Sequence, residues 1–93
     1  MKVYTVEHRE QYCEGPLDFD CTGAAVFSSV EKAEEWLRIQ GHTWKTERLC
    51  WFVMFEEEVD PDPAKTMAFI EWIGVYDING NKISEQPYEN RSE

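Results

Sequence analysis

Hydrophobic and polar residues alternate at the start of the chain, as they do along a half-buried β-strand. Within residues 2–8, one side would carry Tyr4, Val6 and His8, and the other Val3, Thr5 and Glu7. This period of two predicts a strand over residues 2–8. Residues 9–23 show no such pattern and predict a long connection with room for a short extra strand. The apolar residues 24–27 predict another short strand.

A helix is predicted next, over about residues 29–40. Ser28 and Glu31 have the spacing of a capping box, in which each side chain accepts from the other residue's backbone N–H. Apolar residues then recur at helical spacing, at Val30, Ala33 and Leu37 with Trp36 at the flank. Gly41 follows as the residue that ends the helix.

The second half of the chain predicts an antiparallel arrangement of strands. The aromatic-rich run from Leu49 to about Val59 predicts a buried strand, and residues 67–78 predict the next one. Prolines interrupt the chain between them, because each removes a backbone donor. In residues 67–78, Ile73 and Val75 alternate with Trp72 and Tyr76. The Asn79-Gly80 pair predicts a type I′ hairpin that returns over residues 81–84.

These elements predict one α+β domain over residues 1–86, followed by a frayed acidic tail over 87–93. Its core would be an antiparallel sheet of four to five strands with one α-helix, about residues 29–40, packed on one face. One helix covers only part of a sheet. Aromatic side chains exposed on the other face would mark an interface.

Charge narrows the classes of partner. Nineteen acidic residues stand against nine basic ones, which gives a net charge of −10 at neutral pH. Such a chain repels nucleic acid and anionic membranes, so neither is expected to bind directly. Solubility is the common reason for such acidity, and a basic protein partner is the functional alternative.

The chain carries no signal for export or membrane insertion at its start, and no apolar run reaches the length of a membrane span. We therefore expect a cytoplasmic protein, in the host cytosol if it is phage-encoded. The three cysteines, Cys13, Cys21 and Cys50, have no disulfide-framework spacing, so reduced thiols are expected.

Spacing argues against the common metal and phosphate sites. His8, His42 and the three cysteines contain no tight ligand pair of the kind that zinc sites use. The segment from Asp18 to Gly23 resembles the start of a calcium loop, but Ser29 stands where a bidentate acid is required. No glycine-rich phosphate loop occurs. We expect no metal, no cofactor and no catalytic residues, unless histidine and cysteine side chains meet in the fold.

The strongest remaining signal is an acidic run with five carboxylates in seven residues. The predicted partner-binding residues are these five acids and an aromatic anchor on the sheet: Glu56, Glu57, Glu58, Asp60, Asp62 and Trp72. Acids between Glu7 and Asp20 would join them if both segments lie on one side of the sheet. A negative patch speeds and steers association with a basic partner. The alternative is that these acidic residues only form the solvated end of a strand and bind no partner.

Two motifs resemble a family of small uncharacterised proteins of bacteria and their phages. That family pairs a first strand reading V/Y-x-V-x-H, as in residues 3–8, with a helix start reading V-F/Y-S-S-x-E-K-A, as in residues 26–33. A later strand ends in Val-Asp, which Val59-Asp60 matches. The resemblance implies an α+β fold and a bacterial or phage setting, and it brings no catalytic residue.

Three hypotheses follow. The leading one is a non-enzymatic acidic protein-binding module, a phage-type inhibitor of a basic host or defence protein, of the anti-defence or DNA-mimic kind. The second is a small homo-oligomer, such as a homodimer, that buries the uncovered sheet face across a two-fold axis. The third is a thiol- or metal-dependent enzyme.

Overall fold

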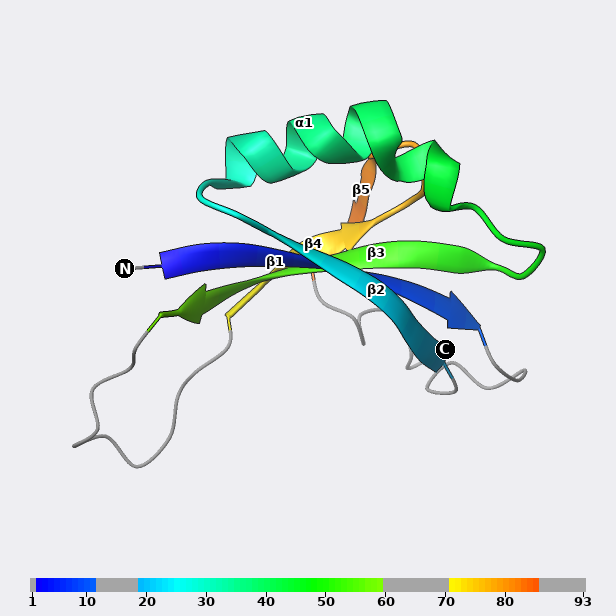
Figure 1. Cartoon of the computed structure of the whole chain (residues 1–93), viewed down its shortest axis with the longest axis horizontal. Coiled ribbons are helices and arrows are strands. Elements are labelled where there is room, and N and C mark those ends of the chain that lie inside the picture. The colour runs from blue at the N-terminus through cyan, green and yellow to red at the C-terminus, as the bar shows by residue number, and fades with distance from the viewer. Residues whose placement is uncertain (1, 12–18, 60–70, 86–93) are drawn as a thin grey trace.

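The chain folds as a five-stranded antiparallel sheet with a helix on one face, in agreement with the predicted fold class (Figure 1). A computed structural model describes residues 2–11, 19–59 and 71–85. Its elements are β1 (Lys2–Gln11), β2 (Phe19–Phe27), α1 (Val30–Gln40), the short 3₁₀ helix η1 (Gly41–Trp44), β3 (Cys50–Glu58), β4 (Glu71–Tyr76) and β5 (Lys82–Ser84). The strands lie in the order β2-β1-β3-β4-β5.

Strands β1 and β2 are longer than the hydrophobic pattern predicts. Part of the predicted connection over residues 9–23 belongs to these two strands. Their pairing begins with Tyr4 opposite Phe27 and ends with Gln11 opposite Phe19. The register shifts where His8 pairs with Gly23 and Arg9 with Cys21, which leaves Thr22 as the extra residue of a β-bulge. This bulge breaks the period of two in β2, so the alternation alone does not reveal the part of that strand before Gly23.

The helix begins one residue later than the capping-box prediction placed it. Ser29 is the N-cap, and its Oγ accepts a hydrogen bond of 3.2 Å from the backbone N–H of Lys32. Gly41 does not end the helix in a left-handed conformation, because its φ of −55° is helical and the chain continues into η1. A glycine fits there for another reason: a Cβ atom would lie 2.8 Å from the carbonyl oxygen of Ile78.

The main core lies between α1 and the sheet. It consists of Val6, Ala33, Leu37, Phe52, Met54 and Tyr76, with half-buried residues around them. The predicted helix stripe is confirmed, since Ala33 and Leu37 are buried and Val30 packs against the cluster. Phe52 is the centre of its aromatic part, with ring centroids 5.0 Å from His8, 6.0 Å from Trp36 and 6.2 Å from Trp44.

The second face of the sheet carries a smaller buried cluster of Val53, Phe55 and Val75, with Trp51 packed against it. These three side chains are 0%, 8% and 8% exposed in the complete chain. Among the described residues, the second face is therefore not a broad exposed aromatic surface. On β4, Trp72 is the large hydrophobic residue of this face that reaches solvent, at 37% exposure. Among the described residues, no helix is long and apolar enough to cross a membrane.

A second β-bulge corrects the predicted grouping of side chains on β4. Phe55 pairs with Trp72 and Met54 with Gly74, so Ile73 is the extra residue. Strict alternation would place Trp72 and Tyr76 on one side. The bulge instead directs Tyr76 to the helix-side core and Trp72 against Phe55 on the second face, where the ring centroids are 5.3 Å apart.

The predicted hairpin between β4 and β5 forms around Asn79-Gly80, but with a different turn. The N–H of Gly80 donates to the carbonyl of Asp77 over 3.0 Å, so Ile78 and Asn79 are the central residues. Gly80 follows with a φ of +86°, in the left-handed region that glycine adopts without strain. This is the three-residue hairpin loop rather than a two-residue type I′ loop.

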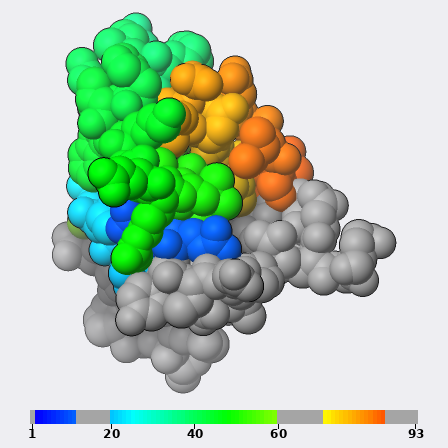
Figure 2. All heavy atoms as spheres, turned by 90° about the vertical axis from the view of Figure 1, so that its right-hand side faces the viewer, coloured from blue at the N-terminus to red at the C-terminus, as the bar shows by residue number. Residues whose placement is uncertain are grey.

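Gly23 allows η1 to pack closely on β2. A Cβ atom at this position would overlap the ring of Trp44, which also contacts His8 and Trp36 at centroid distances of 5.5 and 5.7 Å. The absent side chain thus leaves space for the indole to lie on the strand. Figure 2 shows the same end of the molecule, where the C-terminal part of α1 lies beside the hairpin that leads to β5.

We expect Gly23→Ala to lower the free energy of unfolding by about 1–3 kcal/mol, because the added methyl group forces Trp44 out of its position. Urea denaturation followed by circular dichroism measures this change. The matched control is Ala24→Ser, which adds one atom to an exposed neighbouring residue and should change stability by less than about 0.5 kcal/mol. Equal losses in both variants would contradict this account of Gly23.

Candidate functional site

The three consecutive glutamates of β3 do not form one continuous patch, because neighbouring side chains of a strand point to opposite faces. Glu56 forms an ion pair of 2.9 Å with the Nζ of Lys2. Glu57, on the other face, accepts a hydrogen bond of 2.7 Å from the Oγ1 of Thr5. Glu58 is exposed at the end of the strand. Each carboxylate therefore has a different environment.

The fold adds a fourth carboxylate to this end of the sheet. Glu71, the first residue of β4, is exposed and pairs directly with Glu56 across the two strands. Glu56, Glu57, Glu58 and Glu71 together are called the acidic end below. Lys2 is opposite Glu58 in the register, and its hydrogen bond to Glu56 raises the pKa of its ammonium group, with a smaller contribution from the charge of Glu71.

Trp72 lies beside the acidic end on the second face. Its ring meets Phe55 edge-on, and the guanidinium carbon of Arg9 lies 5.6 Å from the ring centroid, within the range of a cation–π contact. Glu57 is two residues beyond Phe55 on the same face. Because Phe55 is directly opposite Trp72, Glu57 is the diagonal neighbour of Trp72, at about 7–8 Å in a regular sheet. A partly exposed indole held between two neighbours is a preorganised anchor for a partner.

The Arg9 side chain that supports Trp72 is itself held in place. Arg9 is 8% exposed, and its Nε donates to the Oε1 of Glu7 over 2.8 Å. Cys21 lies next to this pair in the sheet. Its pKa is raised by partial burial and then by the charge of Glu7, so its thiol stays protonated at neutral pH. A protonated thiol is a poor nucleophile.

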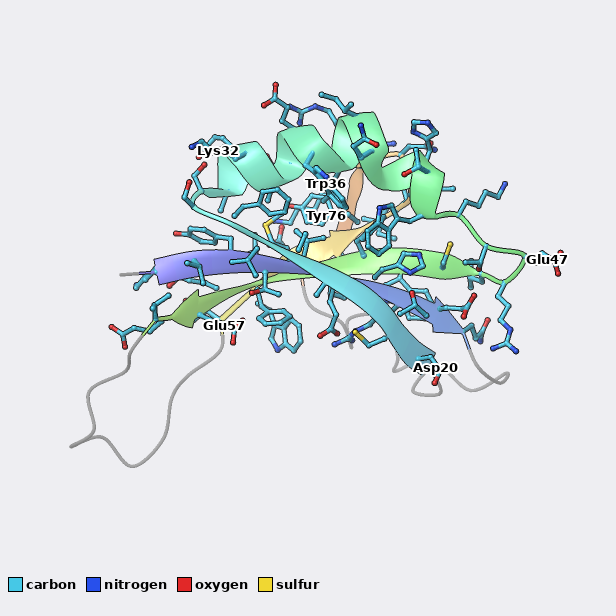
Figure 3. The ribbon with its side chains drawn as sticks, in the orientation of Figure 1. Asp20, Lys32, Trp36, Glu47, Glu57 and Tyr76 are labelled. Atoms are coloured by element: carbon cyan, nitrogen blue, oxygen red, sulfur yellow. The ribbon has the colours of Figure 1, made fainter. Side chains whose placement is uncertain are left out.

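The two acidic segments do not form one patch, because the fold places them at different ends of the sheet. Strands β1 and β3 are antiparallel, with Lys2 opposite Glu58 and Glu10 opposite Cys50. Glu10 and Asp20 therefore lie at the end of the sheet opposite the acidic end. Figure 3 shows this separation, with Glu57 at one end and Asp20 and Glu47 at the other. Asp60 and Asp62 fall outside the described residues, as do Glu14 and Asp18.

The residues considered for metal or thiol chemistry are scattered. Cys21 is exposed and Cys50 is buried, and both are free thiols. His42 is exposed in η1, and Cys13 lies outside the described residues. Within residues 2–11, 19–59 and 71–85, no group of three histidine, cysteine or acidic side chains is arranged to hold a metal ion.

His8 is the exceptional polar residue of the core, at 1% exposure. Its Nδ1 is hydrogen-bonded to the hydroxyl of Thr22, which the β-bulge brings alongside. Its Nε2 is buried and has no hydrogen-bond partner. Burial lowers the pKa of the imidazole, and the charge of Glu10 opposes this shift more weakly. The ring therefore packs as a neutral aromatic residue.

A comparison of the chain with protein-family models, with curated proteins and with solved structures finds no match. Sequence reasoning missed Glu71 and Arg9 as parts of the surface. The pairing of Glu71 with Glu56 depends on the register of two strands, and the contact of Arg9 with Trp72 depends on the bulge at Ile73.

The burial of neutral His8 predicts a loss of stability in mild acid. The unfolded chain takes up a proton near pH 6.5, whereas the folded chain resists protonation down to its lower pKa. Stability should therefore fall as the pH drops below about 6.5, by up to about 1.4 kcal/mol per pH unit. Urea midpoints between pH 7.5 and 5.5 measure this slope.

His8→Phe should reduce that slope, because phenylalanine keeps the aromatic packing and does not titrate. His42→Gln is the matched control, since His42 is exposed and should leave the slope as it is. A slope that stays the same in His8→Phe and disappears in His42→Gln would show that the buried imidazole is not its source.

Proposed function

We propose that the chain is a non-enzymatic protein-binding module that engages a basic protein through the acidic end and Trp72. The observation that carries this proposal is the position of Trp72, which is 37% exposed and fixed by Phe55 and Arg9 directly beside the carboxylates. Tryptophan is the residue most enriched among interface hot spots, and flanking charges steer the encounter.

The electrostatics of this surface favour a cationic partner. Four carboxylates gather at the acidic end, and Lys2 is the one basic residue that the described strands place among them. The whole chain has the same sign, with a net charge of −10 at neutral pH. Arginine- or lysine-rich surfaces would therefore be attracted over the range of the Debye length, about 8 Å at physiological ionic strength.

The narrower proposal is inhibition of a basic host or defence protein by a phage-encoded chain. The resemblance of residues 3–8 and 26–33 to small bacterial and phage proteins supports this setting. A nucleic-acid-binding protein is the natural basic target, because its groove already accepts phosphates. In that case the carboxylates of the acidic end would occupy phosphate positions, as in a DNA mimic.

The alternative functions draw less support. A homodimer through the second sheet face would need an exposed apolar face, whereas Val53, Phe55 and Val75 are buried. For an enzyme, the described residues offer a protonated exposed thiol at Cys21 and an inaccessible imidazole at His8. Neither is a ready nucleophile or base.

Removing charge from the acidic end should weaken binding and make it less dependent on salt. The basic partner would first be captured from bacterial lysate on the immobilised chain and then titrated against it at several salt concentrations. Glu58→Gln/Glu71→Gln changes two exposed residues and should raise Kd about tenfold at low salt, with a shallower slope of log Kd against log salt.

The matched control is Glu35→Gln/Glu47→Gln, which removes the same charge from exposed residues away from the acidic end. It should change Kd by no more than about twofold. Equal effects of both double variants would mean that total charge, and not this surface, draws the partner. Duplex DNA and heparin, added separately as competitors, test the mimic version, because only a nucleic-acid groove should release the chain to DNA more readily than to an equal charge of heparin.

Trp72→Ala should raise Kd by about 30-fold or more, which corresponds to about 2 kcal/mol, while leaving the salt slope as in the wild type. An anchor contributes by burial, and screening by salt has little effect on burial. Trp72→Phe serves as the paired variant that retains packing against Phe55. If Trp72→Ala folds normally and binds as tightly as the wild type, the indole is not part of the interface.

A further inference from the structure

Strand β2 forms a long edge of the sheet. It is first in the strand order and nine residues long, and its other edge pairs with β1. Among the described residues, no strand pairs with its outer edge. Alternate backbone N–H and C=O groups along such an edge point away from the sheet and are able to accept another strand. In Figure 1, β2 passes in front of β1 and β3.

This edge lacks most of the devices that normally prevent strand pairing. Residues 19–27 contain no proline and no lysine, and Asp20 is their one charged residue. The bulge at Thr22 is the single irregularity, and it leaves Gly23–Phe27 in regular pairing with Tyr4–His8. The opposite edge differs, because β5 has three residues and begins with Lys82.

Side chains along this regular segment leave room for a neighbour. Gly23, Ala24 and Ala25 are small, and Val26 is 61% exposed. An exposed valine with small neighbours on an edge strand is a typical pairing surface and otherwise an aggregation risk.

The local charge favours a second copy of the chain over a basic partner. The acidic end lies on β3 and β4, two strands away from β2. Trp36 marks the side of α1 that faces β2, because its ring centroid lies 5.6 Å from that of Phe27, the last residue of β2. Lys32 and Gln40, one turn away on either side, share this side of the helix. Two copies would therefore meet here with little like-charge repulsion.

We propose that two copies of the chain pair antiparallel through the outer edges of β2 to form one continuous ten-stranded sheet. An antiparallel pair of identical strands has a two-fold axis perpendicular to the sheet, so the same residues serve on both copies. Both α1 helices then lie on the same face. Because α1 packs over β1 and β2, the helices flank the seam and their Trp36 sides face each other.

Sedimentation velocity of the full chain, from low micromolar to several hundred micromolar, tests the proposal. The wild type should reach the mass of a dimer. Val26→Lys places a charge on an exposed side chain of the edge and should raise the dimer dissociation constant at least tenfold. Ala24→Lys, at a second exposed residue of β2, should do the same.

Ile83→Lys is the matched control, since Ile83 is 57% exposed on the opposite edge strand and the change in net charge is identical. The Ile83→Lys variant should dimerise as the wild type does. A wild type that stays monomeric at every concentration would overturn the proposal. So would a dimer that survives both β2 variants, or one that Ile83→Lys disrupts equally. None of these results bears on the acidic end, which belongs to a different surface.

Discussion

The packing of α1 and η1 against Phe52 is the interaction on which the rest of the structure depends. Phe52 is 1% exposed on the central strand β3, and its ring meets His8, Trp36 and Trp44. A chain of this size buries a smaller share of its surface than larger domains do, so a few aromatic contacts supply much of its stabilisation. The absence of a side chain at Gly23 and the neutral state of His8 both serve this packing.

The same central strand sets the chemistry of the surface. Alternation along β3 places Phe52 and Met54 toward the helix and Val53 and Phe55 toward the second face. Continued to the end of the strand, it divides the glutamates between the two faces. The acidic end is therefore a rim around one end of the sheet, and the bulge at Ile73 places Trp72 beside it.

The molecule has two separate candidate binding surfaces, the acidic end and the outer edge of β2, and they differ in chemistry. The acidic end concentrates charge beside a rigid indole, whereas the β2 edge carries little charge and offers backbone groups. Electrostatic steering suits a basic protein, and strand pairing suits a second copy of the chain. Both can operate at once, and a dimer through β2 would present two acidic ends to one partner or to two.

Local patterns in the sequence determined the elements of this protein. The stripe of Ala33 and Leu37 predicted α1, the apolar run before Glu56 predicted β3, and Asn79-Gly80 predicted the last hairpin, because each signal lies within a few residues of the structure that it specifies. The same patterns identified Glu56, Glu57, Glu58 and Trp72 as surface candidates, although the partner-binding role of these residues stays a prediction.

Only the tertiary structure decided which of these residues meet. The strand register placed Glu71 opposite Glu56, and the bulges at Thr22 and Ile73 brought a hydroxyl to His8 and turned Trp72 to the second face. One extra residue in a strand reverses every side chain beyond it. The choice of such a bulge depends on long-range packing, which no local pattern records.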